Sequence, residues 1–163
     1  MTRAWNLLEL PEYSFRTTWL VRAPREEVFQ VIWDSERWPE WWRGVQSVVK
    51  LEEGDSDGVG SLGRYSWRSR LPYTLEFDTR IIRVERPHLL EGHATGELEG
   101  TGLWRLFEQT GLTAVVYDWR VRTTRPWMNL LAPVAKPLFA WNHDAIMSWG
   151  AEGLAGRLGA PPP

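Results

Sequence analysis

The chain has 163 residues, of which 25% are charged and 43% hydrophobic, with a net charge of -2 and no cysteine. This composition is ordinary for a folded domain and argues against disorder, while the lack of cysteine excludes disulfides, thiolate nucleophiles and cysteine-ligated metals. The balanced charge, without a polybasic run, disfavours nucleic acid and anionic membranes as partners.

Residues 13–22 form the first predicted strand. Every second residue belongs to one face, which carries Tyr13, Phe15, Thr17, Trp19 and Val21. This period of two indicates a strand with one buried face. Residues 23–33 then predict a helix, because Pro24 suits a first turn and apolar residues recur at helical spacing. A second short helix is expected over residues 35–42, ended by Gly44.

Six further strands are expected between residues 45 and 123. They are indicated by alternating apolar residues separated by turn-forming residues. The predicted stretches are 45–54, 60–70, 74–87, 88–102 (a strand, a turn and the start of another strand) and a hairpin over 103–123. The hairpin is expected to turn at Thr110-Gly111.

Residues 129–158 predict one long helix. Apolar residues recur every three or four positions, at Leu131, Val134, Leu138, Trp141, Ala145 and Trp149. This stripe is expected to lie buried against the sheet. Pro133 is tolerated near the helix start, whereas Pro137 should kink the helix.

The order of elements predicts an α+β protein. A curved seven-stranded antiparallel sheet is expected to wrap around the long C-terminal helix, with two short helices between the first and second strands. The space between the sheet and the helix is the natural place for a ligand. Residues 1–163 are expected to form a single domain.

Five segments make the sequence similar to a known superfamily. They are W-L-V-R-A-P-R-E-E-V-F at 19–29, W-P-E-W-W-R-G-V at 38–45, G-x-W-R-L at 102–106, G-L-T-A-V-V-Y-D-W-R-V at 111–121 and W-N-H-D-A-I-M-S-W-G-A-E-G-L at 141–154. Over residues 13–158 the chain resembles the START-related helix-grip superfamily (SRPBCC), in particular its bacterial polyketide cyclase/dehydrase-like and lipid-transport-like branch. The resemblance implies the helix-grip fold. It implies no single activity, since the superfamily includes cyclases, aromatases, hydrolases, ligand carriers, hormone receptors and co-chaperones.

Trp38, Trp41 and Trp42 fall within five positions. In relatives this segment is the short second helix over the mouth of the cavity, so the resemblance implies that the three side chains partly close it. Trp38 or Trp41 is also expected to anchor the helix, because a buried tryptophan removes about 150–250 Å² from water. Anchoring and lining of the cavity stay open for each tryptophan.

The inward faces of the strands and the helix stripe supply the candidate ligand-binding residues. These are Trp19, Trp41, Tyr65, Trp67, Phe77, Trp104, Tyr117, Trp119, Leu138, Trp141, Asn142 and Trp149. An aromatic wall with few hydroxyls suits a flat hydrophobic molecule such as a polyketide, sterol, quinone or fatty acyl group. The alternative is a core that these side chains fill completely. Trp33 is assigned to the core between the first helix and the sheet.

The sequence has no motif that compels a metal or a cofactor, and none is expected. His88, His93 and His143 lack converging ligand spacing, and each is expected at the surface or in a capping role. Proton transfer in the cavity would fall to Tyr65, Tyr117 or His93.

The charged strand residues are expected to face solvent. Arg64, Arg68, Asp78, Asp118 and Arg120 alternate with the apolar positions. Only an inverted register would bring Arg64, Arg68 and Asp78 into the cavity.

Three classes of function are compatible with this pattern. The preferred one is binding of a small hydrophobic molecule, and the alternative is a polyketide cyclase, aromatase or dehydrase acting in the same cavity. A uniformly apolar cavity would favour the first and a polar dyad at its base the second. A protein-interaction module would instead show a filled core and an exposed apolar patch.

The location of the protein is expected to be cytoplasmic. The opening MTRAWNLLELPEYSF lacks the apolar core of a signal peptide, and no stretch approaches the ~20 apolar residues of a membrane span. The tail GAPPP is expected to be a frayed end. A monomer or homodimer without stable membrane insertion is predicted.

Overall fold

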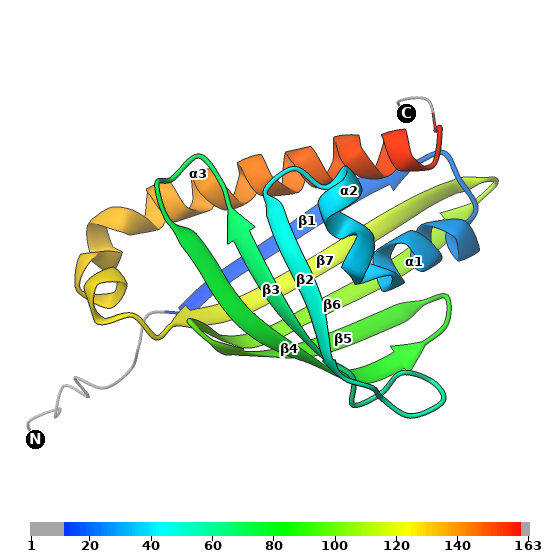
Figure 1. The fold of residues 1–163 in the computed structure, drawn as a ribbon. Helices are drawn as coiled ribbons and strands as arrows, with labels where there is room; N and C mark the ends of the chain where they lie inside the picture. Colours follow the sequence, from blue (N-terminus) through cyan, green and yellow to red (C-terminus); the bar gives the residue numbers. More distant parts are fainter. Residues whose placement is uncertain (1–11, 161–163) are drawn as a thin grey trace, which may run out of the picture.

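The computed structural model describes residues 12–160. Its seven strands form one antiparallel sheet in the order β1-β7-β6-β5-β4-β3-β2, which curves around the C-terminal helix α3 (Figure 1). This is the predicted helix-grip fold. The expectations about the start of the chain and the last residues of its tail concern residues outside the described range.

The elements follow the predicted order. The strands are β1 (Glu12–Val21), β2 (Val45–Glu52), β3 (Leu62–Arg68), β4 (Thr74–Glu85), β5 (Leu89–Gly96), β6 (Leu98–Gln109) and β7 (Leu112–Thr123). Between β1 and β2 lie α1 (Arg25–Trp33), the 3-10 turn η1 (Ser35–Arg37) and α2 (Trp38–Trp41), and the chain ends in α3 (Pro126–Arg157). No helix within residues 12–160 combines the length and the apolar character that a membrane crossing needs.

The alternating residues of the strands face as predicted. In β1 the buried or half-buried side chains are the odd-numbered ones from Tyr13 to Val21. Each of them pairs with an odd-numbered residue of β7, as in Phe15 opposite Trp119. The two antiparallel strands therefore contribute one continuous apolar surface to the concave side of the sheet.

The β6–β7 hairpin turns where the sequence predicts it. Thr110 and Gly111 are the two loop residues between the paired Gln109 and Leu112. Both have positive φ, 53° and 75°. A two-residue loop with positive φ at both positions matches the right-handed twist of the flanking strands.

The predicted buried stripe of α3 is wrong. Leu131, Val134, Leu138 and Trp141 are 51%, 83%, 46% and 46% exposed, and Ala145 and Trp149 are half-buried. The buried residues of α3 are Met128, Ala132, Met147, Gly150 and Leu154. This second stripe also has helical spacing, and its small members let the helix axis approach the sheet.

The helix α3 begins earlier than predicted, at Pro126, and includes both internal prolines. Figure 1 shows that its axis bends in the yellow-to-orange first part, the stretch that contains Pro133 and Pro137. Proline removes one helical hydrogen bond and crowds the preceding turn, which explains the expected kink.

Glycines allow the second half of α3 to pack tightly. A Cβ at Gly150 would lie 2.6 Å from atoms of both Trp19 and Trp42, and a Cβ at Gly153 would lie 1.9 Å from the carbonyl oxygen of Trp41. Trp42 also donates a hydrogen bond of 2.9 Å from Nε1 to the carbonyl oxygen of Ile146. The close contact between α2 and α3 therefore depends on the absence of a side chain at Gly150 and Gly153.

This packing predicts that Gly153→Ala lowers the free energy of unfolding. The new methyl group would push the backbone of Trp41 away, at a cost of about 1–3 kcal/mol. Gly156→Ala is the matched control, because its Cβ would meet nothing within 4 Å, and alanine should leave stability equal or slightly higher. Chemical denaturation measures both. Equal stabilities of the two variants would contradict the close contact.

Candidate functional site

A cavity of about 310 Å³ lies between the concave face of the sheet and α3. Its walls come from all seven strands and from α1, α2 and α3, and its rim includes η1 and the loop after β2. The alternative of a completely filled core is therefore wrong. The cavity has the size and the position of a ligand pocket, at the lower end of the usual range of about 300–1,000 Å³.

Stacked aromatic rings form the sheet side of the cavity. Trp104 and Tyr117 stack with ring centroids 3.9 Å apart, and Trp119 lies 5.7 Å from Tyr117. A Cβ at Gly102 would lie 2.7 Å from the Tyr117 hydroxyl and 3.0 Å from the Trp119 ring. The glycine makes the space that these rings occupy, so that flat faces line the cavity.

The tryptophans of α2 combine both expected roles. Trp38 and Trp42 line the cavity and are almost fully buried. The Nε1 of Trp38 donates to the carbonyl oxygen of Ile32 at 3.1 Å, which fixes α2 to α1. Trp41 is not part of the cavity wall but stacks on Trp42 at 5.4 Å. Trp38 and Trp42 therefore anchor the short helix and close the cavity together.

One end of the cavity contains a histidine that the sequence analysis assigned to the surface. His143 lies in the cavity wall, and its ring stacks on Phe15 with centroids 4.2 Å apart. Neither ring nitrogen has a hydrogen-bond partner within residues 12–160; the nearest carboxylate oxygen, of Asp144, is 3.7 Å from Nδ1. Burial lowers the pKa of His143 below its ordinary value of 6.5, and Asp144 opposes this shift. The imidazole is therefore neutral at neutral pH.

Two further donors in the wall lack partners among the described residues. They are the hydroxyl of Tyr13 and the indole Nε1 of Trp67. Tyr13 is near His143, since its ring packs 6.2 Å from that of Phe15. Burial raises the pKa of Tyr13, so its hydroxyl keeps its proton and can donate it in a hydrogen bond. A buried donor without an acceptor costs about 1–3 kcal/mol, which a bound oxygen atom would offset.

Two other polar side chains of the wall, Tyr65 and Asn142, are already paired. The hydroxyl of Tyr65 donates to Ser35 at 3.1 Å, and the hydroxyl of Ser69 donates to the side-chain oxygen of Asn142. Burial raises the pKa of Tyr65, and that of Tyr117 more strongly. Both are neutral phenols at physiological pH.

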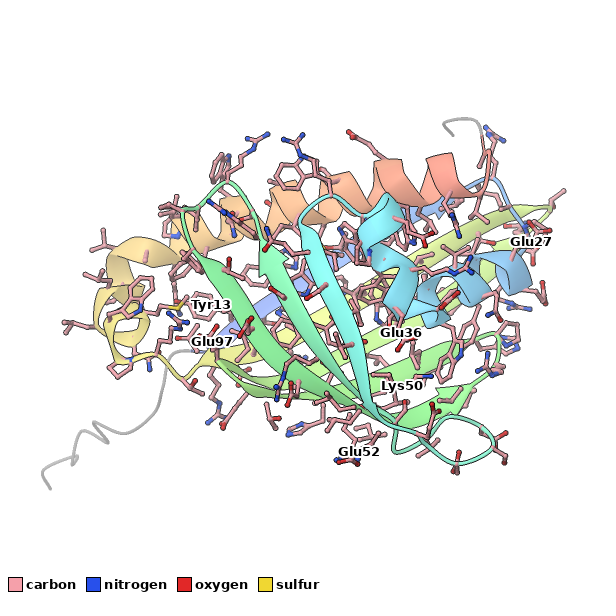
Figure 2. All side chains as sticks on the ribbon, viewed as in Figure 1. Tyr13, Glu27, Glu36, Lys50, Glu52 and Glu97 are labelled. Atoms are coloured by element: carbon pink, nitrogen blue, oxygen red, sulfur yellow. The ribbon has the colours of Figure 1, made fainter. Side chains whose placement is uncertain are left out.

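The two ends of the cavity differ in charge. Figure 2 shows Tyr13 at the end near the start of β1, and Glu36 and Lys50 beneath α2. At the second end Glu36 accepts a hydrogen bond of 3.1 Å from the backbone of Lys50. The rim around α2 is therefore polar and charged, whereas the Tyr13 end is aromatic.

The structure brings seven of the twelve candidate ligand-binding residues into the cavity wall. These are Tyr65, Trp67, Phe77, Trp104, Tyr117, Trp119 and Asn142. Their contact with a ligand stays a prediction.

The other five candidates lie elsewhere. Trp19 is buried in the core against Trp42, at 5.2 Å between ring centroids. Trp41 packs outside the cavity. Leu138 and Trp141 belong to the stripe of α3 that was expected to be buried, and both are exposed. Trp149 lines a shallow groove on the surface.

One more assignment is wrong and another is incomplete. His93 is exposed on the outer side of β5, opposite Arg80, and cannot act in the cavity. Trp33 packs against the core but is only half-buried, and it also lines the cavity rim; a Cβ on Gly58 of the neighbouring loop would lie 2.2 Å from its ring. His143 could have been recognised from the second stripe of α3, because it lies four residues from both Phe139 and Met147.

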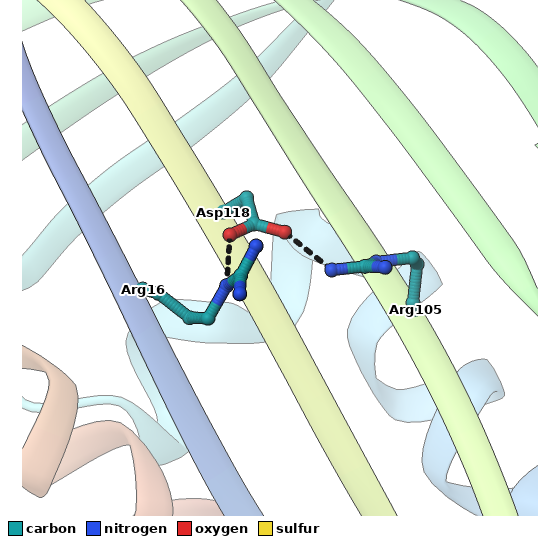
Figure 3. A network of polar contacts seen from close by, with 3 residues as sticks. All are labelled: Arg16, Arg105 and Asp118. Carbon is teal, nitrogen blue, oxygen red and sulfur yellow. Dashed lines mark hydrogen bonds and ion pairs between the residues drawn. The ribbon is translucent and has the colours of Figure 1, made fainter.

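Ion pairs between charged strand residues lie on the convex side of the sheet, as the strand pattern predicts. Arg16 and Arg105 each donate to Asp118 at 2.6 Å, joining β1, β7 and β6 (Figure 3). The hydrogen bond from Arg16 contributes most to the lowered pKa of Asp118. Arg64 and Asp78 form a second outer pair at 2.8 Å. Within the part of the chain that the structure describes, no cluster of three potential metal ligands occurs.

Comparison with known proteins gives one family match. The family described as polyketide cyclase / dehydrase and lipid transport matches residues 21–147. A search of curated proteins gives no significant match.

Solved structures share the fold at low sequence identity. The Zhui aromatase/cyclase from Streptomyces sp. R1128 is 16% identical, with a TM-score of 0.71 over 90% of this chain and 93% of that chain. A START superfamily protein from Mycobacterium smegmatis is 17% identical, with a TM-score of 0.72 over 88% and 95% of the two chains. A protein from Thermus thermophilus is also 17% identical, with a TM-score of 0.72 over 89% and 99%.

The environment of His143 predicts a pH dependence of stability. Because its pKa is lower in the folded than in the unfolded chain, only the unfolded chain gains this proton as the pH first falls below about 6.5. The free energy of unfolding should therefore decrease from neutral pH to about pH 5, and His143→Gln should reduce that decrease. Denaturant titrations at several pH values measure it, with the exposed His93→Gln as control. Identical pH profiles of wild type and His143→Gln would contradict the burial of a neutral imidazole.

Proposed function

The chain belongs to the polyketide cyclase/dehydrase and lipid transport family, and on this premise we propose that its cavity binds a small, flat, hydrophobic molecule that carries oxygen atoms. The observation that carries the proposal is the combination of stacked aromatic walls with unpartnered polar groups in the same cavity. Stacked rings favour a planar ligand. The free donors favour one with carbonyl or phenolic oxygens.

The size of the cavity narrows the class of ligand. At about 310 Å³ it fits a compact aromatic or quinone-like molecule better than a long acyl chain. Tyr13 lies at one end of the cavity and Glu36 and Lys50 lie at the other (Figure 2), while stacked rings form the sheet side. An aromatic polyketide or a related polyphenol has this distribution of apolar rings and peripheral oxygens.

A second candidate function is a cyclase, aromatase or dehydrase reaction on such a ligand. His143 favours it, because a neutral imidazole in an apolar wall can accept a proton from a bound molecule. Ring closure of a folded reactive chain requires little beyond such a base and a shaped cavity. The imidazole has no orienting partner at hydrogen-bond distance within the described residues. The cavity is thus neither uniformly apolar nor equipped with a dyad, and binding is the primary proposal.

Titration with candidate ligands tests the proposal. Polyphenols, quinones, sterols and fatty acids are added to the protein while tryptophan fluorescence and the melting temperature are followed. A flat oxygen-bearing ligand should quench fluorescence saturably and raise the melting temperature. Product analysis after incubation separates binding from turnover. Lack of response to the whole panel would contradict a ligand cavity.

Tyr13→Phe tests the role of the unpartnered donor. The substitution removes a hydroxyl that no described residue uses, so stability should stay equal or rise. Affinity for the oxygen-bearing ligand should fall by roughly 2- to 10-fold, the net value of one hydrogen bond. Tyr65→Phe is the matched control: its hydroxyl is bonded to Ser35, and its loss should lower stability. Unchanged affinity in Tyr13→Phe would place the ligand oxygens elsewhere.

A further inference from the structure

The first half of α3 presents a second apolar side to solvent. We define the outer α3 face as Trp127, Leu130, Leu131, Val134, Leu138 and Trp141, which are between 44% and 83% exposed. The opposite side of the same turns is buried through Met128 and Ala132. A helix that is apolar all round normally has both sides covered. The outer α3 face is therefore an unusual surface for a protein surrounded by water alone.

Cations predominate around the first turns of this face; the nearest acidic residue of α3 is Asp144, three residues after Trp141. From residue 126 to residue 143, α3 contains Lys136 and no acidic residue. The loop between β3 and β4, residues 69–73, contains Arg70 and no acidic residue. The sequence as a whole is slightly acidic, but cations that are far apart along the chain gather here.

An arginine groove continues the surface. Arg43, Arg68 and Arg70 line it around Trp149. The guanidinium group of Arg43 lies 4.4 Å from the centre of the Trp149 ring. Among residues 12–160, none of the three arginines has an acidic side chain at ion-pair distance, in contrast to Arg16, Arg64, Arg80 and Arg105. Unpaired, stacked guanidinium groups are suited to phosphate and carboxylate anions.

The groove and the outer α3 face are continuous. Arg70 stacks at 5.2 Å over Trp141 and at 5.7 Å over Trp149. At the other end of the same loop, Tyr73 contacts Trp127 edge to face at 5.8 Å. Figure 1 shows the β3–β4 loop reaching the first part of α3. Apolar side chains and free cations thus form one surface.

We propose that the outer α3 face and the arginine groove dock together on the surface of an anionic lipid bilayer. Exposed tryptophan and leucine beside lysine and arginine are the composition of interfacial helices, whose apolar face enters the headgroup region while cations bind lipid phosphates. A second copy of this chain, in a two-fold symmetric contact, fits this surface less well than a bilayer does. Such a contact would bring Lys136 and the arginines of one copy towards those of the other, and no acidic residue is found among the described residues that line the groove or among residues 126–143.

The docking surface lies over one end of the cavity. Met128 and Phe139, on the inner side of the same turns, line the cavity, as does Tyr73 of the adjoining loop. A ligand soluble in the bilayer would therefore approach the chain at the end nearest to its binding site. The docking surface stands independently of the proposed ligand, because none of the residues that define the outer α3 face lines the cavity.

Co-sedimentation with vesicles tests the proposal. The full chain is mixed with vesicles of phosphatidylcholine alone and with vesicles that also contain phosphatidylglycerol, at low and high salt. We expect binding to the anionic vesicles that weakens as salt rises. Arg70→Gln should lower the partition coefficient about fivefold, the contribution of one cation near an anionic surface. Leu130→Gln with Val134→Gln should lower it at least tenfold, since both side chains lose apolar burial.

Matched controls separate docking from general effects of charge and hydrophobicity. Phe107→Gln removes an exposed apolar side chain from β6, and Arg120→Gln removes an exposed cation from β7. Both should leave partitioning unchanged, and all variants should keep the ligand affinity of the wild type. Absence of binding to anionic vesicles would overturn the proposal, as would equal binding of wild type and the Leu130→Gln/Val134→Gln variant. A dimer in solution that this double variant dissociates, without vesicle binding, would also overturn it by assigning the face to a second copy.

Discussion

One helix has to cover the concave face of seven strands, although the helix is much narrower than the sheet. The rest of the structure follows from this difference in width. Neighbouring strands lie about 4.8 Å apart, so six spacings span roughly 29 Å, whereas a helix with its side chains is about 10–12 Å thick. The short helix α2 and the indole rings of the strands cover part of the remainder. The cavity of about 310 Å³ is what these groups leave open. A protein with this architecture needs large, flat side chains, and the tryptophans supply them.

The alternation of the strands divides the chemistry of the protein into two sides. Ion pairs such as the Asp118 cluster lie on the convex side, where water screens them and their contribution to stability is small. In the interior of the concave side the polar groups are neutral, because an ionised group there would lose its hydration. The lowered pKa of His143 and the raised pKa of Tyr117 have this one cause. The interior can thus donate and accept hydrogen bonds without holding a fixed charge.

Much of the fold could be predicted from the sequence, because a period of two leaves a strand only one apolar face. Phe77, Trp104 and Trp119 were placed correctly on the inner side for that reason. The orientation of α3 could not be predicted, since two apolar stripes run along it and hydrophobicity does not distinguish them. Close packing determines which stripe is buried: the small residues Ala132 and Gly150 pack in the interior, whereas Leu138 and Trp141 are exposed. Because the helix was misoriented, His143 was assigned to the wrong side. The site was therefore predicted in its sheet half, whereas in its helix half Asn142 was predicted and His143 was missed.

The two prolines of α3 give the helix unequal ends. Neither Pro133 nor Pro137 has an amide hydrogen, so the carbonyl groups of Asn129 and Pro133 have no helical donor four residues later. The last turns keep their hydrogen bonds and are locked to α2 through Gly150 and Gly153. Local opening therefore costs less free energy at the first turns of α3 than at the last. The protein can loosen the Tyr13 end of its cavity while the tryptophan cluster beneath α2 stays folded.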